Sequence, residues 1–191
     1  MKLLHLLPIG NCDGQLLQEL GAAMGKVFRV PFLVLPQALA PEAAFHAERQ
    51  QYHSSEILAA TQGFSTNDSW RVLGVAAVDL YIPILTFVFG EAQIGGPCAV
   101  VSSYRLRQEF YGLPADAGLL RARLLKEAVH EIGHTLELSH CHDYRCAMAP
   151  SHAVEWIDIK DAWLCPQCEA RAVGAMEEAT SGASYWPPAR T

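Results

Sequence analysis

The 191-residue sequence contains three histidines and a glutamate at spacings typical of a metal site. His130 and His134 are four residues apart, so on a helix they lie one turn apart on one face, where both imidazoles can reach one ion. Glu131 follows the first histidine and can take a proton from a water beside the metal. His140 supplies a third imidazole, and three protein ligands leave a fourth position on zinc for water. The pattern therefore predicts a catalytic zinc site.

The third histidine can join this site only if the helix ends before it. A straight helix would carry His140 ~15 Å along the axis from His130 and ~80° away from its face. In the motif H-E-x-x-H-x-x-G-x-x-H a glycine makes the necessary turn in the left-handed conformation, but Glu137 occupies that position here. A residue with a side chain costs ~1 kcal/mol there, which metal binding can offset. We therefore expect a sharp turn near Glu137 and a formed three-histidine site.

Four of the six cysteines are clustered and predict a second metal site. Two short chelating loops, C-x4-C and C-P-Q-C, supply enough thiolates to close a tetrahedral zinc with no open position, as in structural sites. The four are Cys141, Cys146, Cys165 and Cys168. Disulfides or a redox C-x-x-C are the weaker alternative, because no thioredoxin-like strand precedes Cys165. His142 and His152 are alternative ligands, whereas Cys12 and Cys98 lie apart and are expected to be small buried hydrophobes.

The two predicted sites adjoin in the chain. Cys141 directly follows His140, so a structural zinc would anchor the backbone beside the third histidine, and we expect the two sites to be mechanically coupled. Met148 lies in "CAMAP", an expected tight turn that can pass beneath the histidines as an apolar floor. Residues 149–153 then follow as candidates for the wall of a substrate pocket.

The elements that must position these residues are visible as apolar periodicity. A helix over residues 118–136 carries His130, Glu131 and His134, and its leucines, isoleucine and valine form one apolar stripe. Shorter helices are expected over residues 13–25 and 41–60. A loosely attached tail is expected from residue 181 to the end. Short apolar runs predict five strands, over residues 3–9, 27–35, 71–78, 86–89 and 98–102.

Composition excludes several classes of function. A net charge of −6 and a pI near 5.7 provide no basic field for nucleic acid or anionic lipid. No apolar run approaches the ~20 residues that span a bilayer, and Pro8 and Gly10 interrupt the first apolar run before a signal-peptide core is complete. We expect a soluble, cytoplasmic monomer that binds neither nucleic acid nor membrane.

The combined pattern H-E-x-x-H-x5-H-C-x4-C-x-M with a downstream C-x-x-C resembles the archaemetzincins, a branch of the metzincin clan of zinc peptidases. The pattern runs from His130 to Cys168. Weaker similarity extends upstream through "MKLLHLLPIGN", "VDLYIPILTFVFGEAQIGG" and "AVVSSYRLRQEFYG". The resemblance implies two Zn²⁺ per chain, with the three histidines as catalytic ligands, Glu131 as general base, Met148 as the Met-turn residue and the four cysteines around the second zinc.

The resemblance also implies a fold and an activity. The fold class would be α/β (α+β), with a mixed five-stranded sheet and the active-site helix in an N-terminal subdomain, residues 1–140. A small C-terminal subdomain, residues 141–191, would hold the structural zinc and the Met-turn. A peptide or protein substrate would lie along an edge strand within residues 86–100 and be hydrolysed by Glu-assisted attack of zinc-bound water. The alternative is a zinc-stabilised peptide-binding module with little or no proteolytic activity.

Overall fold

A five-stranded sheet forms the centre of the computed structural model, which describes residues 1–181. Three neighbouring parallel pairs build most of it, and the last strand is antiparallel, so the strand order is β2-β1-β5-β8-β7. The predicted mixed five-stranded α/β sheet is confirmed. Its strands are β1 (Leu3–Ile9), β2 (Phe32–Val34), β5 (Ser69–Ala76), β7 (Gly90–Ala92) and β8 (Cys98–Ser102).

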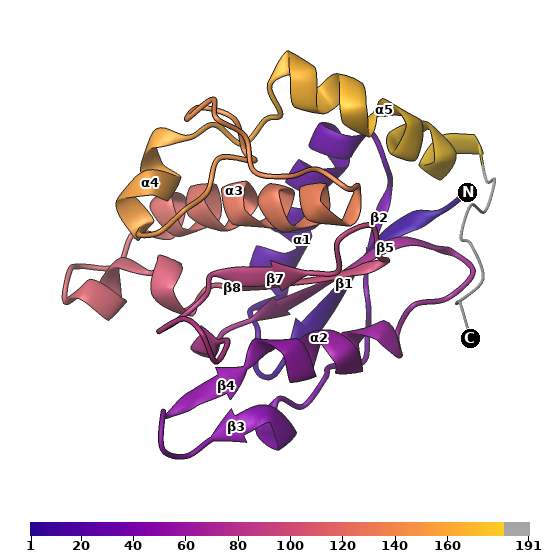
Figure 1. The fold of residues 1–191 in the computed structure, drawn as a ribbon. Coiled ribbons are helices and arrows are strands. Elements are labelled where there is room, and N and C mark those ends of the chain that lie inside the picture. Colours follow the sequence, from indigo (N-terminus) through magenta and orange to yellow (C-terminus); the bar gives the residue numbers. More distant parts are fainter. Residues whose placement is uncertain (182–191) are drawn as a thin grey trace.

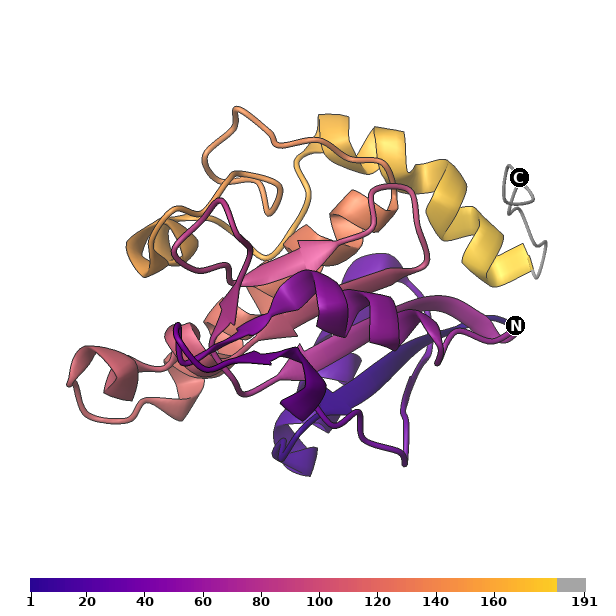
Figure 2. The same ribbon diagram turned by 60° about the horizontal axis from the view of Figure 1, so that its bottom comes forward.

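Helices cover both faces of the sheet, which is why β1, β5 and β8 are almost continuously buried. Helices α1 (Gly14–Phe28) and α3 (Ala117–Thr135) lie on one face. Helix α2 (Ser54–Gln62) lies on the other, as Figures 1 and 2 show. Beside α2 is a small sheet of β3 (Phe45–His46), β4 (Gln51–His53) and β6 (Leu80–Tyr81). Each face of the main sheet therefore has its own hydrophobic core.

Capping residues start the two long helices. The carboxylate of Asp13 accepts from the N–H of Gln15 at the start of α1, and that of Asp116 accepts from the N–H of Leu119 at the start of α3. After α3 the chain passes over that helix through long loops and α4 (Val154–Ile159), then enters α5 (Pro166–Ser181), as Figure 1 shows. Three short 3₁₀ turns complete the fold, at Glu42–Ala44, Tyr104–Leu106 and Gln108–Tyr111.

Three predicted elements were wrong in extent or type. The strand expected over residues 27–35 is shorter, because α1 continues to Phe28. The Phe28 side chain is buried, as is that of Met24 one helical turn earlier, and the helix ends where Arg29 adopts a φ of 55°. The helix expected over residues 41–60 is a 3₁₀ turn, a hairpin and α2, because Tyr52 pairs with Leu80 in the small sheet. Residues 86–89 form no strand.

Strand β7, one of the two edge strands of the main sheet, lies directly after that segment. Within residues 86–89 only a single bridge joins Val88 to Leu80.

Within residues 1–181, none of the helices combines the length and apolarity needed to cross a membrane. Most of the expected tail, residues 182–191, lies outside the described part of the chain.

Candidate active site

Helix α3 ends with the turn that His140 requires. The N–H of Glu137 donates to the carbonyl of His134, and the N–H of Leu138 donates to the carbonyl of Gly133, each at 3.1 Å. Glu137 has a φ of 62°, so it takes the left-handed position that a glycine usually fills in a Schellman motif. The chain reverses there and brings His140 back toward the helix.

The three histidines converge. One ring nitrogen from each of His130, His134 and His140 lies within 4.8 Å of the others. The Nε2 atoms of His130 and His134 are 3.1 Å apart. The Nδ1 atoms of these two histidines face away from the cluster. Nδ1 of His130 lies 2.9 Å from the carbonyl of Ala147, and Nδ1 of His134 lies 2.8 Å from the carbonyl of Leu138. A carbonyl can only accept, so each Nδ1 carries the proton and each Nε2 presents a lone pair to the cluster.

This donor set fits a zinc ion. Two ligands ~2.1 Å from a tetrahedral ion lie ~3.4 Å apart, close to the observed separation of the two Nε2 atoms. Burial lowers the pKa of His130 well below its usual value, and burial also lowers the pKa values of His134 and His140. The imidazoles are therefore neutral near pH 7, which is the form that binds metal.

The Glu131 carboxyl lies against the edge strand, beside the histidines. Its side chain is buried, and a Cβ atom on Gly90 would be 2.6 Å from Glu131 Cγ and 2.7 Å from Oε1. Only a glycine in β7 allows so close an approach. Burial, followed by the charge of Glu127, raises the pKa of Glu131 well above its usual value. A carboxyl with a raised pKa suits a group that accepts and returns a proton near neutral pH.

A groove of about 560 Å³ runs past these residues. One wall is β7 with the loop before it, and the opposite wall is the segment that follows the Met148 turn. The groove contains the residues expected for the substrate pocket from Pro150 to His152. Its lining is largely apolar and includes Ile82, Leu85, Phe87, Phe89, Gly90, Ala92, Glu127, His130, Glu131, His134, His140, Pro150, Ser151 and His152.

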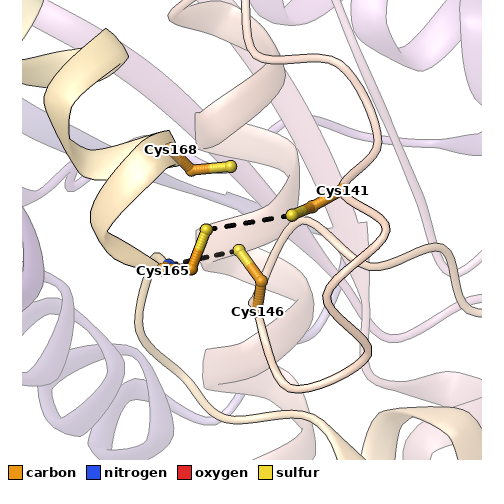
Figure 3. Close-up of side chains that lie close together, drawn as sticks. All are labelled: Cys141, Cys146, Cys165 and Cys168. Atoms are coloured by element: carbon orange, nitrogen blue, oxygen red, sulfur yellow. Dashed lines mark hydrogen bonds between the residues drawn. The ribbon is translucent and has the colours of Figure 1, made fainter.

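The four clustered cysteines also converge, as Figure 3 shows. Cys165 and Cys168 lie at the start of α5, and Cys141 and Cys146 lie on the loop that faces it. The Sγ atoms of Cys141 and Cys165 are 3.8 Å apart, too far for a disulfide. Two sulfurs that bind one tetrahedral zinc at ~2.3 Å are ~3.8 Å apart, so the spacing fits that ion.

A local hydrogen bond favours the thiolate form of one cysteine, whereas burial opposes it at two others. The N–H of Cys168 lowers the pKa of the Cys165 thiol, whereas burial raises the pKa values of Cys146 and Cys168. A dication at the centre offsets such a burial cost, because it stabilises thiolates directly. Cys12 and Cys98 lie outside this group. Cys98 is fully buried, as expected, whereas Cys12 is only partly buried and its thiol donates to the carbonyl of Val75.

Met148 lies under the histidine helix. Its thioether packs directly on Gly133, and a Cβ atom at that position would overlap with Met148 Sδ. The carbonyl of Met148 accepts from the N–H of Cys141 at 2.9 Å, so the turn is tied to the residue that follows His140. Met148 thus lies against the helix that carries His130 and His134, on the side of Gly133. His142 and His152 belong to neither group of converging ligands among residues 1–181.

Sequence reasoning missed two residues of this region, Glu127 and Lys160. Glu127 lies one helical turn before Glu131 and lines the groove; its Oε1 is 2.7 Å from Lys160 Nζ and accepts from Ser151 Oγ at 3.1 Å. The four-residue spacing between Glu127 and Glu131 is a signal in the sequence, because it places two carboxyls on one helix face. An isolated lysine such as Lys160 provides no comparable signal.

Comparison with known proteins agrees with this geometry. The sequence matches Peptidase family M54 over residues 22–173. It is 42% identical over 161 residues to the archaemetzincin of Methanocaldococcus jannaschii, which covers 84% of this chain and 87% of that protein. The crystal structure of Archaeoglobus fulgidus archaemetzincin complexed with malonate matches with a TM-score of 0.77 and 35% identity, over 90% of this chain and 99% of that one. A zinc-dependent peptidase from Methanocorpusculum labreanum matches with a TM-score of 0.80 and 28% identity, over 88% and 99% of the respective chains.

The converging histidines, and all four clustered cysteines, lie within the range that matches the family. Such a likeness in sequence and fold confirms the resemblance that the histidine and cysteine pattern indicated. The chain belongs to peptidase family M54, the archaemetzincins, and is therefore a zinc metallopeptidase in general terms.

Proposed function

We propose that this protein hydrolyses peptide bonds with His130, His134 and His140 as zinc ligands and Glu131 as the general base. The observation that carries the proposal is the convergence of the three imidazoles in one groove with a buried carboxyl beside them. Zinc bound there supplies a Lewis acid that polarises the scissile carbonyl and makes water a stronger acid.

Glu131 moves the proton. Its carboxylate takes one proton from the water whose oxygen forms the new bond to the scissile carbon, and returns it to the amine nitrogen as the carbon–nitrogen bond breaks. The raised pKa of Glu131, which follows mainly from its burial, favours acceptance of the proton in the first transfer. Gly90 leaves room for the carboxyl at the strand edge, where the substrate backbone would pass.

The edge strand β7 supports an extended substrate. The carbonyl of Phe89 accepts from the N–H of Ser102, and the N–H of Gln93 donates to the carbonyl of Cys98, so alternate residues of this strand face β8. The main-chain groups of Gly90 and Ala92 between them point the other way, and both residues line the groove. A peptide that adds to this edge gains main-chain hydrogen bonds without regard to its sequence.

We further propose a structural zinc at Cys141, Cys146, Cys165 and Cys168, giving two zinc ions per chain. The groove would separate an N-terminal subdomain, residues 1–140, from a C-terminal one, residues 141–191. Four clustered thiols suit a reducing compartment, so we place the protein in the cytoplasm, as a monomer acting on peptides or proteins and not on nucleic acid or membranes. The net charge of −6 supports the choice of partner.

A quenched fluorescent peptide library, with metal analysis of the same protein, tests this proposal. The zinc-loaded protein should cleave, and Glu131→Gln should lower the rate ~10²-fold or more, while Glu109→Gln, an exposed acid outside the groove, should not. Cleavage unchanged by Glu131→Gln would refute the role of Glu131. Peptide binding without cleavage, with zinc at the cysteines alone, would instead support the peptide-binding module.

A further inference from the structure

Lys160, just after α4, carries an ammonium enclosed beside the candidate site. Its side chain has no exposed surface, and its Nζ is 2.7 Å from Oε1 of Glu127. The same Nζ donates to the carbonyls of Ala147 and Ala149, at 3.1 and 3.2 Å. These carbonyls flank Met148. Three partners account for the three donors of an ammonium, which makes this buried charge tolerable and its position well defined.

One of these carbonyls is shared with a histidine. The oxygen of Ala147 accepts from Lys160 Nζ and also from Nδ1 of His130, at 2.9 Å. The hydrogen bond to Nδ1 keeps the proton there and leaves Nε2 with its lone pair facing the other imidazoles. The position of a single backbone carbonyl therefore sets which nitrogen of His130 can bind metal.

The segment that carries Lys160 is itself fastened to α3. The guanidinium of Arg123 donates to both carboxylate oxygens of Asp158, at 2.7 and 2.6 Å. Lys126 Nζ donates to the carbonyls of Ile157 and Asp158. The pair of Glu127 and Lys160 is thus the second of two ion pairs between this helix and this segment, and it alone continues to the carbonyls around Met148.

We propose that Lys160 is a positioning residue for the metal site: its ammonium holds the Ala147 carbonyl against Nδ1 of His130 and so fixes the tautomer whose Nε2 can bind zinc. Glu127 is its counter-ion, which keeps the ammonium in place without itself touching the histidines. This role rests on the proposed function of His130 as a zinc ligand. It adds a residue thirty positions downstream whose side chain touches neither metal nor substrate.

The double variant Lys160→Met with Glu127→Gln tests this role without leaving an unpaired buried charge. Long-range ¹H–¹⁵N spectra, recorded on protein without metal at the histidines, should show His130 protonated on Nδ1 in the wild type and a mixture of tautomers in the variant. Zinc affinity at the histidines, measured by competition with a chelator, should fall about 10-fold to 100-fold. The spectra need no turnover, so they can fail or succeed independently of peptide cleavage.

Two comparisons separate positioning from general packing. Arg123→Met with Asp158→Asn removes the parallel ion pair between the same elements, and should keep the wild-type tautomer and zinc affinity. Glu127→Gln alone removes the counter-ion that keeps the ammonium in place, so it should change the tautomer and the zinc affinity in the same direction as the first double variant, by a smaller amount. An unchanged tautomer in the first double variant, or equal losses of zinc affinity in both double variants, would overturn the proposal. If the variant Lys160→Met with Glu127→Gln does not fold, the variant Lys160→Gln with Glu127→Gln replaces it. The glutamine side chain is shorter than that of lysine and carries no charge, and the same results are expected.

Discussion

The sulfur of Met148 packs on the Cα of Gly133, in the space that any larger side chain at that helix position would occupy. Gly133 directly precedes His134, so Met148 reaches the helix only where the helix carries no side chain. A glycine inside a helix costs ~1 kcal/mol relative to alanine. The close packing of Met148 explains why that cost is accepted in the last turn of α3.

Gly133→Ala should therefore destabilise the protein although alanine is the better helix former. Forcing a methyl group onto the Met148 thioether costs about 1–3 kcal/mol of the free energy of unfolding, more than the gain in helix propensity. Urea denaturation measures this difference. Gly174→Ala in α5 is the matched control, because nothing lies within 4 Å of its Cβ position; it should raise stability by about 0.4–1 kcal/mol. Equal effects at the two glycines would contradict the packing explanation.

Glu137 provides a second test, of backbone strain. Because its φ is 62°, Glu137→Gly should raise the free energy of unfolding by about 1 kcal/mol and leave the histidine site intact. Glu137→Ala is the control, since it removes the carboxylate that packs over Gly95 but keeps the strained backbone. Thermal unfolding of the wild type and the two variants should give a clearly higher midpoint temperature for Glu137→Gly than for the other two proteins. Should alanine stabilise as much as glycine, the carboxylate and not the backbone is the unfavourable feature.

The parts of the site that sequence could predict are those whose spacing is local. His130 and His134 share a helix face by periodicity alone, and the turn at Glu137 follows because His140 cannot otherwise reach them. The sheet was predictable for a related reason: buried strands such as β1 and β8 are continuous apolar runs with clear ends.

What sequence could not predict depends on distant pairing. Tyr52 lies in an alanine-rich stretch that favours helix, and only its pairing with Leu80, far along the chain, makes it a strand. Lys160 likewise reads as a surface lysine until the fold encloses it between Glu127 and two carbonyls. Long-range contacts override the local helix propensity at Tyr52, and they bury a charged side chain at Lys160 that would otherwise be expected on the surface.

Loss of the cysteine site should weaken zinc binding at the histidines. Cys168→Ser removes one of four thiolates and should lower the zinc content by one ion per chain and the free energy of unfolding by several kcal/mol. Because the N–H of Cys141 is bonded to the Met148 carbonyl and its chain neighbour is His140, zinc affinity at the histidines should also fall. Metal analysis with chelator competition measures both effects. Cys12→Ser is the control: its hydroxyl can keep the bond to the Val75 carbonyl, so zinc content should not change.

The last prediction concerns Glu91, which fastens the edge strand from behind. The hydroxyls of Ser54 and Ser55, at the start of α2, both donate to its carboxylate. The carboxylate thereby holds β7 against the helix while the Gly90 and Ala92 backbone faces the groove. Glu91→Ala should loosen the strand along which we propose that the substrate aligns. It should therefore raise KM several-fold with a smaller change in kcat, because the histidines and Glu131 are held by other elements.

Steady-state kinetics on a peptide that the wild type cleaves would measure this split. Gln93→Ala is the matched control, since it removes the other side-chain bond between this edge and α2, the exposed one from Gln93 to Gln62 at 3.3 Å. That bond lies beyond the residues expected to pair with substrate, so KM should stay near the wild-type value. A fall in kcat alone for Glu91→Ala would mean that Glu91 acts on Glu131, whose pKa its charge helps to raise, and not on the alignment of substrate along β7.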